Sequence, residues 1–237
     1  DSFARFEELF VTLAEWIYKK NQIGYTGLAG LLAEISENDA MRRQTLIQHL
    51  MRIAVDENKY GRPYLCRSAA DILHGMNLGT IALVSPESQF SGNAGGVGIY
   101  TTDIADVLAE LGFHVVVITP LYEFSRDRII KTYAPHYDGH SFTIQCPEFD
   151  DSTQGISRNT TPDVINILRS NLLRVKHGKR SCVEVLYLEN GKYLDTPYGG
   201  LTCEDKLRRT RILSQGALEA LRAYNYYPSI IQTNEWP

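Results

Sequence analysis

The part of the chain best suited to chemistry is a glycine-rich stretch, Gly92-Asn-Ala-Gly-Gly-Val-Gly98. It follows a short apolar run, Ile81 to Val84, and precedes a helical pattern. Glycines allow positive φ angles and let a ligand approach peptide N–H groups closely, and the start of a helix carries positive partial charge. The stretch therefore suits a phosphate, or the hydroxyls of a sugar phosphate. Tight packing between two secondary-structure elements is the alternative explanation for the glycines. A ligand is favoured because the glycines follow the carboxyl end of a predicted parallel strand, where open α/β sheets bind ligands.

Two common nucleotide-binding motifs do not fit this stretch. The dinucleotide fingerprint would extend Gly96-Val-Gly98 to a third glycine at position 101, where Thr101 stands. A P-loop would end in Gly-Lys followed by Ser or Thr, and no such residues follow the glycines. The glycines therefore indicate neither a dinucleotide site of the usual kind nor a P-loop.

The elements around the glycines form a βαβ pattern. A helix after the loop is indicated by apolar residues at helical spacing: Ile104, Val107, Leu108 and Leu111. Gly112 suits its C-terminal cap, and the run from Val115 to Ile118 predicts a second buried strand that ends at Pro120. The connection between the two strands should be right-handed.

The pattern continues to the end of the chain. We expect a strand at Cys182–Leu188, an amphipathic helix at Glu204–Tyr224 and a further strand from Ile230. Residues 79–237 thus predict an α/β domain with a Rossmann-like parallel sheet and flanking helices. Residues 1–78 contain only helical patterns and predict an α-helical N-terminal segment, either a packing appendage or a module for regulation or carbohydrate contact.

The middle of the domain is less regular. Ser141–Gln145 is predicted as a strand after a turn over Tyr133–His140, and Arg126–Arg128 as a solvated face. A helix is indicated by apolar residues at Val164, Ile167, Leu168 and Leu172. Two histidines, His136 and His140, lack a third ligand, so we expect no metal site.

The turn-rich loop from Asn190 to Gly200 contains Tyr193, Asp195 and Tyr198. Its tyrosines either stack against sugars or anchor the loop to the core, and the sequence does not decide between these. In the following helix we expect apolar residues, Leu218 among them, to pack, and basic residues to face water: Lys206, Arg208, Arg209 and Arg211.

Composition and charge indicate which classes of protein the sequence supports. The 237 residues allow one or two domains, and 43% hydrophobic residues are enough for a core. A net charge of −4 gives no support for nucleic acid or an anionic membrane as partner. The four cysteines lack metal or redox spacing, which favours reduced thiols over two disulfides. No secretory leader or membrane span is evident, so we expect a cytoplasmic protein.

Several ordered stretches resemble one enzyme family. They are Glu87, Ala94–Gly98, Leu108–Tyr122, Val185–Gly199 and Pro228–Trp236. The first three resemble a pattern of Glu, then Lys-x-Gly-Gly-Leu-Gly-Asp, then Gly-His-x-Val and Pro-x-Tyr. That pattern is typical of the N-terminal domain of the bacterial glycogen synthases and plant starch synthases. The order and spacing of these stretches agree with the family across residues 80–237. A single Gly-Gly-x-Gly loop would be weak evidence for the family, and the ordered set is stronger.

The resemblance implies half of a GT-B type retaining glycosyltransferase. In this family the N-terminal domain contacts the α-1,4-glucan acceptor. A C-terminal Rossmann domain of the same full-length chain contacts the donor, a nucleotide-glucose such as ADP-glucose or UDP-glucose. The resemblance implies no cofactor. The stretch 79–237 would be the N-terminal domain, and alone it is expected to be inactive. The resemblance identifies no catalytic residue here and implies these donor- or acceptor-binding residues: Glu87, Asn93, Gly95, Gly96, Val97, Gly98, Tyr198, Asn234 and Glu235.

Three positions depart from the family pattern. Asn93 stands where the family has the lysine that reaches the nucleotide phosphates, Ile99 where it has an aspartate, and Pro237 where it has a histidine near the donor sugar. An amide donates a neutral hydrogen bond, which is about half as strong as a charged one. These losses favour an alternative function, a non-catalytic glucan-binding or regulatory domain derived from the family.

Overall fold

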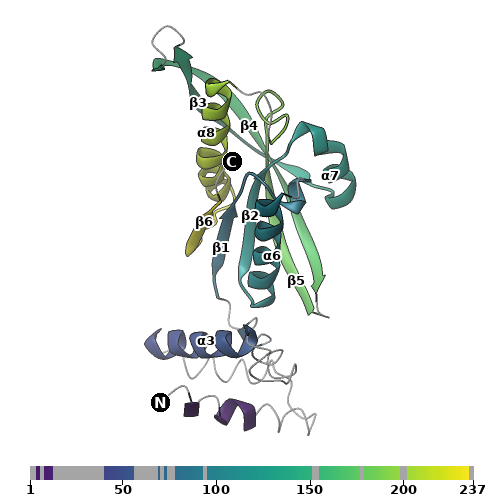
Figure 1. Ribbon diagram of the computed structural model, residues 1–237, viewed down its shortest axis with the longest axis vertical. Helices are drawn as coiled ribbons and strands as arrows, with labels where there is room; N and C mark the ends of the chain where they lie inside the picture. The colour runs from purple at the N-terminus through teal and green to yellow at the C-terminus, as the bar shows by residue number, and fades with distance from the viewer. Residues whose placement is uncertain are drawn as a thin grey trace. The chain divides into compact units, whose positions relative to one another are not determined.

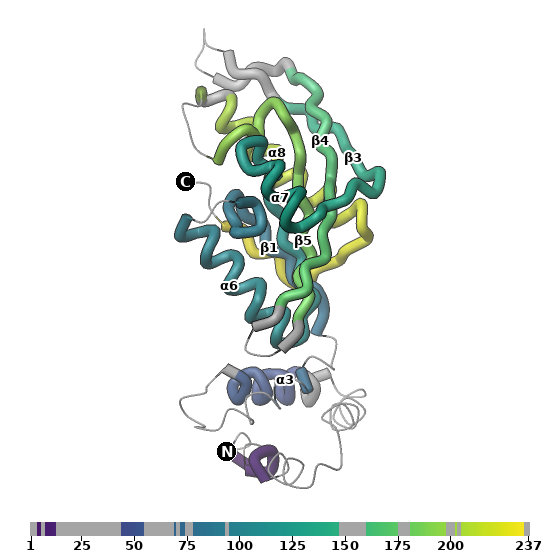
Figure 2. The backbone as a smooth tube through the Cα atoms, turned by 90° about the vertical axis from the view of Figure 1, so that its right-hand side faces the viewer, coloured from purple at the N-terminus to yellow at the C-terminus, as the bar shows by residue number. Residues whose placement is uncertain are grey.

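The computed structural model describes residues 4–5, 8–12, 40–55, 69, 72–73, 78–92, 95–150, 155–176, 179–197 and 202–234 (Figures 1 and 2). The chain forms two compact units, residues 1–78 with 108–113, and residues 79–107 with 114–237. None of the helices within these described ranges is long and apolar enough to cross a membrane.

In the first unit, the described residues before Leu78 are all helical. Helix α3, Ala40–Val55, contributes Leu50 and Ile53 to a small core, as its helical pattern predicts. Four further buried residues complete this core: Phe10, Ala69, Ile72 and Leu73. Residues 13–39 of the predicted helical segment lie outside the described residues.

The second unit contains one six-stranded sheet in the order β3-β4-β5-β2-β1-β6. The strands are β1 (Thr80–Val84), β2 (His114–Pro120), β3 (His136–Asp150), β4 (Gly155–Lys176), β5 (Lys179–Glu189) and β6 (Ile230–Thr233). Strands β5, β2, β1 and β6 are parallel neighbours, whereas β3, β4 and β5 pair antiparallel (Figure 1). The carboxyl ends of the four parallel strands therefore meet at one edge of the sheet.

Helices cover both faces of the parallel strands. Helix α6, Gly96–Glu110, connects β1 to β2 and lies in front of β2 in Figure 1. Helix α8, Cys203–Ala223, connects β5 back to β6, and its residues Ile212 and Ala217 share a core with Ala82 and Val116. Crossovers between parallel strands are right-handed as a rule, and these two run in opposite directions along the sheet, which places α6 and α8 on opposite faces. The predicted buried strands and the α/β class are confirmed.

The helix predicted over Val164–Leu172 is wrong, because this stretch belongs to the long strand β4. Burial alternates with period two along it, but the buried face changes midway. Asp163, Ile165 and Ile167 are buried on one face, and then Leu168, Ser170 and Leu172 on the other. The change of face places Ile167 and Leu168 side by side and imitates a helical spacing. Val164, counted as a packing residue, is 58% exposed.

The segment before β4 also differs from the prediction. Between β2 and β3 the chain forms a short 3-10 helix, η2 (Glu123–Ser125), and then helix α7 (Arg126–Tyr133). Another short 3-10 helix, η1 (Gln89–Ser91), lies between β1 and α6. The predicted turn is shorter than expected, since β3 already begins at His136. Within the described residues no group of three His, Cys, Asp or Glu side chains is placed to hold a metal ion.

The alternation in β4 predicts unequal effects of neighbouring substitutions. Ile165→Ala removes a fully buried side chain and should lower the free energy of unfolding by about 2–4 kcal/mol. Val164→Ala changes an exposed side chain and should cost less than about 1 kcal/mol. Urea unfolding of both variants measures the difference, and a larger loss for Val164→Ala would contradict the strand.

Candidate functional site at the glycine-rich loop

The chain after β1 is held in a tight turn before the glycines begin. Ser88 Oγ accepts a hydrogen bond from Ser91 N at 3.0 Å, and Ser91 Oγ accepts one from Ser88 N at 3.1 Å, so the two serines cap η1 reciprocally. Gly92 then adopts a φ of +82°, and a Cβ there would lie 2.7 Å from Ser125 Cβ. Position 92 therefore requires glycine for both conformation and space.

Two neighbouring glycines of the loop have different surroundings. A Cβ on Gly95 would lie 2.4 Å from Glu87 Oε2, so the absence of a side chain lets the carboxylate pack against the backbone. A Cβ on Gly96, the first residue of α6, would meet nothing within 4 Å. Tight packing thus explains Gly95, whereas Gly96 leaves open space at the start of the helix.

Glu87 is the most unusual side chain at this place. It is 1% exposed, and neither carboxylate oxygen makes a hydrogen bond of good geometry to a described residue. Burial raises the pKa of Glu87, and the nearby backbone N–H of Gly98 partly offsets this by lowering it. A buried carboxylate with so little hydrogen bonding is costly to ionise and keeps the capacity to accept further hydrogen bonds.

A polar network joins the strand ends to the first turns of α6. The hydroxyl of Thr101, fully buried, accepts a hydrogen bond from Asn234 Nδ2 at 2.7 Å and lies 3.0 Å from Ser85 Oγ. Ser85 Oγ in turn donates to the backbone oxygen of Glu87 at 2.6 Å. Thr101 occupies the position of the missing third glycine, and here it fixes Glu87 and the end of β6 to α6.

Two buried tyrosines hold the backbone on either side of Glu87. Tyr122, which follows β2, donates its hydroxyl to Pro86 O at 2.7 Å. Tyr187, on β5, donates to Phe90 O at 3.2 Å. Burial raises the pKa of both phenols, so they remain neutral donors at physiological pH. The loop that carries Glu87 is therefore tied to β5 and to the end of β2.

The loop after β5 is anchored to the core through Tyr193. Asn190 Oδ1 accepts hydrogen bonds from the backbone nitrogens of Lys192 and Tyr193 at 3.1 and 3.0 Å, which turns the chain inward. The Tyr193 side chain is 6% exposed. The anchoring alternative is therefore correct for Tyr193, while Tyr198 lies outside the described residues.

The expectation that Arg208 and Arg209 face water is wrong. Their exposed fractions are 4% and 2%, because the loop after β5 covers this side of α8. Arg208 donates to the hydroxyl of Tyr193, and Arg209 donates to Thr196 O and Asp195. The spacing of apolar residues in α8 cannot show that the loop after β5 covers the polar face of this helix. Leu218, expected to pack, is 55% exposed.

Six of the predicted site residues are described, and they lie around the start of α6 at the carboxyl ends of β1 and β6: Glu87, Gly95, Gly96, Val97, Gly98 and Asn234. Asn93, Tyr198 and Glu235 lie outside the described residues. One contact with the loop was not foreseen: Arg128 of α7, assigned to a solvated face, donates to Gly92 O. No local pattern indicates a contact between residues 36 positions apart.

This architecture, a Rossmann-like sheet with a glycine-rich loop at the carboxyl ends of its parallel strands, is that of one half of a GT-B type glycosyltransferase. The family model described as starch synthase catalytic domain matches residues 80–237. The chain therefore belongs to this family, which confirms the resemblance to the glycogen and starch synthases.

One curated relative supports this assignment. A glycogen synthase of Myxococcus xanthus (strain DK1622) is 28% identical over 163 residues, which cover 66% of this chain and 29% of the relative. The chain thus spans less than a third of that relative's length. No solved structure matches the chain significantly.

The different surroundings of the two glycines predict different effects of alanine. Gly95→Ala forces the Glu87 carboxylate to move and should lower the free energy of unfolding by about 1–3 kcal/mol. Gly96→Ala meets open space in a helix and should be neutral or stabilising by up to about 1 kcal/mol. Thermal and urea unfolding of the matched pair tests this; equal losses would contradict the contact between Gly95 and Glu87.

The raised pKa of Glu87 predicts a pH-dependent stability. The fold binds the carboxyl proton more tightly than the unfolded chain does, so its contribution is fully present below the ordinary pKa of 4.5 and is lost as the pH rises through the higher folded pKa. The free energy of unfolding of the wild type, compared with that of Glu87→Gln, should therefore fall as the pH rises above 4.5.

Urea unfolding from about pH 4 to pH 8 measures this difference. Glu219→Gln on α8, which removes a carboxylate paired with Arg222 at the surface, is the control. A difference between wild type and Glu87→Gln that stays constant across the range would show that Glu87 is not held in an environment that disfavours its charge.

Proposed function

We propose that the chain is the acceptor-side half of a retaining glycosyltransferase that transfers glucose from a nucleotide-glucose to an α-1,4-glucan. Family membership supports glycosyl transfer as the general activity. The donor is proposed to be ADP-glucose or UDP-glucose, and no cofactor is required. A C-terminal Rossmann domain of the same full-length chain is proposed to complete the cleft.

The observation that carries the proposal is the buried carboxylate of Glu87 next to the open start of α6. The carboxylate accepts hydrogen bonds, while the first peptide N–H groups of a helix donate them. A sugar hydroxyl both donates and accepts. A sugar placed over Gly96 would accept hydrogen bonds from these N–H groups, and a shift of the loop would let one of its hydroxyls donate to the buried carboxylate of Glu87.

The same charge argues that this half does not catalyse transfer alone. When the glycosidic bond of a nucleotide sugar breaks, the leaving diphosphate gains negative charge and must be stabilised by positive groups. A buried carboxylate at the loop would oppose such an anion nearby. The main diphosphate contacts are therefore assigned to the second domain, and isolated residues 1–237 should transfer no glucose.

One observation favours a second candidate, a non-catalytic glucan-binding or regulatory domain. Ile99 stands in α6 where the family has an aspartate, and its side chain is 44% exposed. An exposed isoleucine provides neither charge nor hydrogen bonds to a substrate. If the full-length protein binds glucan but releases no nucleoside diphosphate, this candidate replaces the enzyme.

The test measures transfer of labelled glucose from ADP-glucose and UDP-glucose to glycogen by the full-length protein. Gly96→Val fills the open space without touching Glu87, so kcat/KM should fall at least about tenfold while the melting temperature stays unchanged. Ser214→Val, an exposed change on α8, is the control and should retain activity. Full activity of folded Gly96→Val would contradict a sugar site at the start of α6.

A further inference from the structure

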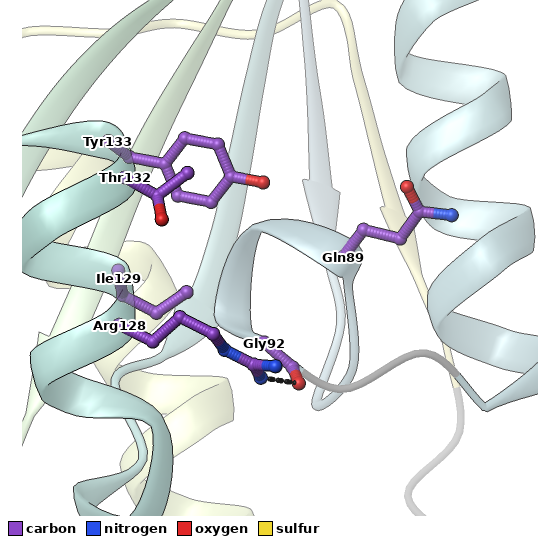
Figure 3. Close-up of a pocket in the computed structure, with 6 residues that line it drawn as sticks. All are labelled: Gln89, Gly92, Arg128, Ile129, Thr132 and Tyr133. Carbon is purple, nitrogen blue, oxygen red and sulfur yellow. Dashed lines mark hydrogen bonds between the residues drawn. The ribbon is translucent and has the colours of Figure 1, made fainter.

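A pocket of about 220 Å³ lies between η1 and α7, beside the first residue of the glycine-rich loop (Figure 3). Its lining consists of Gln89, Gly92, Arg128, Ile129, Thr132 and Tyr133. The volume is smaller than that of a site for a whole drug-sized ligand. It suits a compact group of a substrate.

Arg128 is the charged residue of this lining. Its guanidinium donates to Gly92 O, a neutral carbonyl (Figure 3). Other arginines of the same unit are neutralised, since Arg126 pairs with Glu189 and Arg174 with Asp106, each at 2.9 Å. Among the described residues no carboxylate forms an ion pair with Arg128. Because a guanidinium has five N–H donors, most of them remain for a ligand.

The other side chains of the pocket add hydrogen-bond donors around an apolar base. Thr132 and Tyr133 carry hydroxyls, and Ile129 is 1% exposed. In Figure 3 the hydroxyl of Tyr133 points from α7 toward η1, whereas the amide of Gln89 points away from α7. One cation with two neutral hydroxyls and no acid in the lining matches an oxyanion that has several acceptor oxygens.

We propose that this pocket binds a phosphate group, with Arg128 as the residue that recognises its charge. Gly92 lines the pocket and Gly95 contacts Glu87, so the two sites adjoin opposite ends of one loop. The carboxylate repels anions from its own end, and the arginine attracts them at the other. Assigning the phosphate to a nucleotide sugar rests on the proposed function; phosphate recognition by Arg128 does not.

The first experiment titrates inorganic pyrophosphate into the 237-residue chain by calorimetry at low salt. Arg128→Gln should weaken binding about tenfold, the size expected for one charge-assisted contact. Lys131→Gln removes the same charge from an exposed position of α7 outside the pocket and should leave affinity unchanged. Arg128→Lys should keep part of the affinity, and the wild-type affinity should fall as salt rises.

Because Arg128 is exposed, its variants should fold, and circular dichroism with melting curves checks this. Equal pyrophosphate affinity of wild type and folded Arg128→Gln would overturn the proposal. So would an equal loss for Lys131→Gln, which would indicate general attraction to the helix, or no detectable binding to the wild type.

A second set of titrations separates the two sources of phosphate. If ADP-glucose or UDP-glucose loses affinity with Arg128→Gln as pyrophosphate does, the pocket contributes a contact to the diphosphate of the donor beside those of the second domain. If Arg128→Gln weakens only the binding of pyrophosphate or inorganic phosphate, the pocket binds phosphate but does not bind the nucleotide-glucose. Pyrophosphate binding together with absence of glucose transfer by the full-length protein would refute the proposed function and leave the pocket assignment intact.

Discussion

The burial of one carboxylate beneath a glycine-rich loop constrains everything around it. Glu87 lies 1% exposed against Gly95, where a single added methyl group would come within 2.4 Å of its oxygen. Removing an ionised carboxylate from water costs several kcal/mol unless it is paired or protonated. The fold therefore bears a cost whenever Glu87 is ionised, in line with its raised pKa.

The surrounding scaffold must be rigid to sustain that cost. Tyr122 and Tyr187 tie the backbone on both sides of Glu87 to β2 and β5, and Thr101 ties it to α6 and to Asn234 after β6. These bonds join segments up to 133 positions apart in the chain. The loop thus depends on completion of the whole parallel sheet, so substitutions in the distant β6 segment should be felt at Glu87.

Sequence reasoning succeeded where the signal is local. The β1–α6–β2 unit follows from two apolar runs, a helical repeat and glycines at its turns, all within 41 consecutive residues from Thr80 to Pro120. It failed for β4, where the change of buried face between Ile167 and Leu168 imitates a helix. It also failed for Arg209, since only the folded loop shows that Asp195 and Thr196 are its partners.

The charges around the loop explain why sugar and phosphate recognition should be divided. A phosphate next to Glu87 would meet a carboxylate in a poorly solvated place, where like charges repel strongly. Protonating Glu87 would relieve this but would also remove one of its acceptor sites. A neutral sugar avoids the conflict, and Arg128 offers an anion the opposite environment, at Gly92 rather than Gly95. Under the proposed function, a sugar phosphate would therefore bind best with its sugar at the Gly95 end of the loop and its phosphate at the Gly92 end.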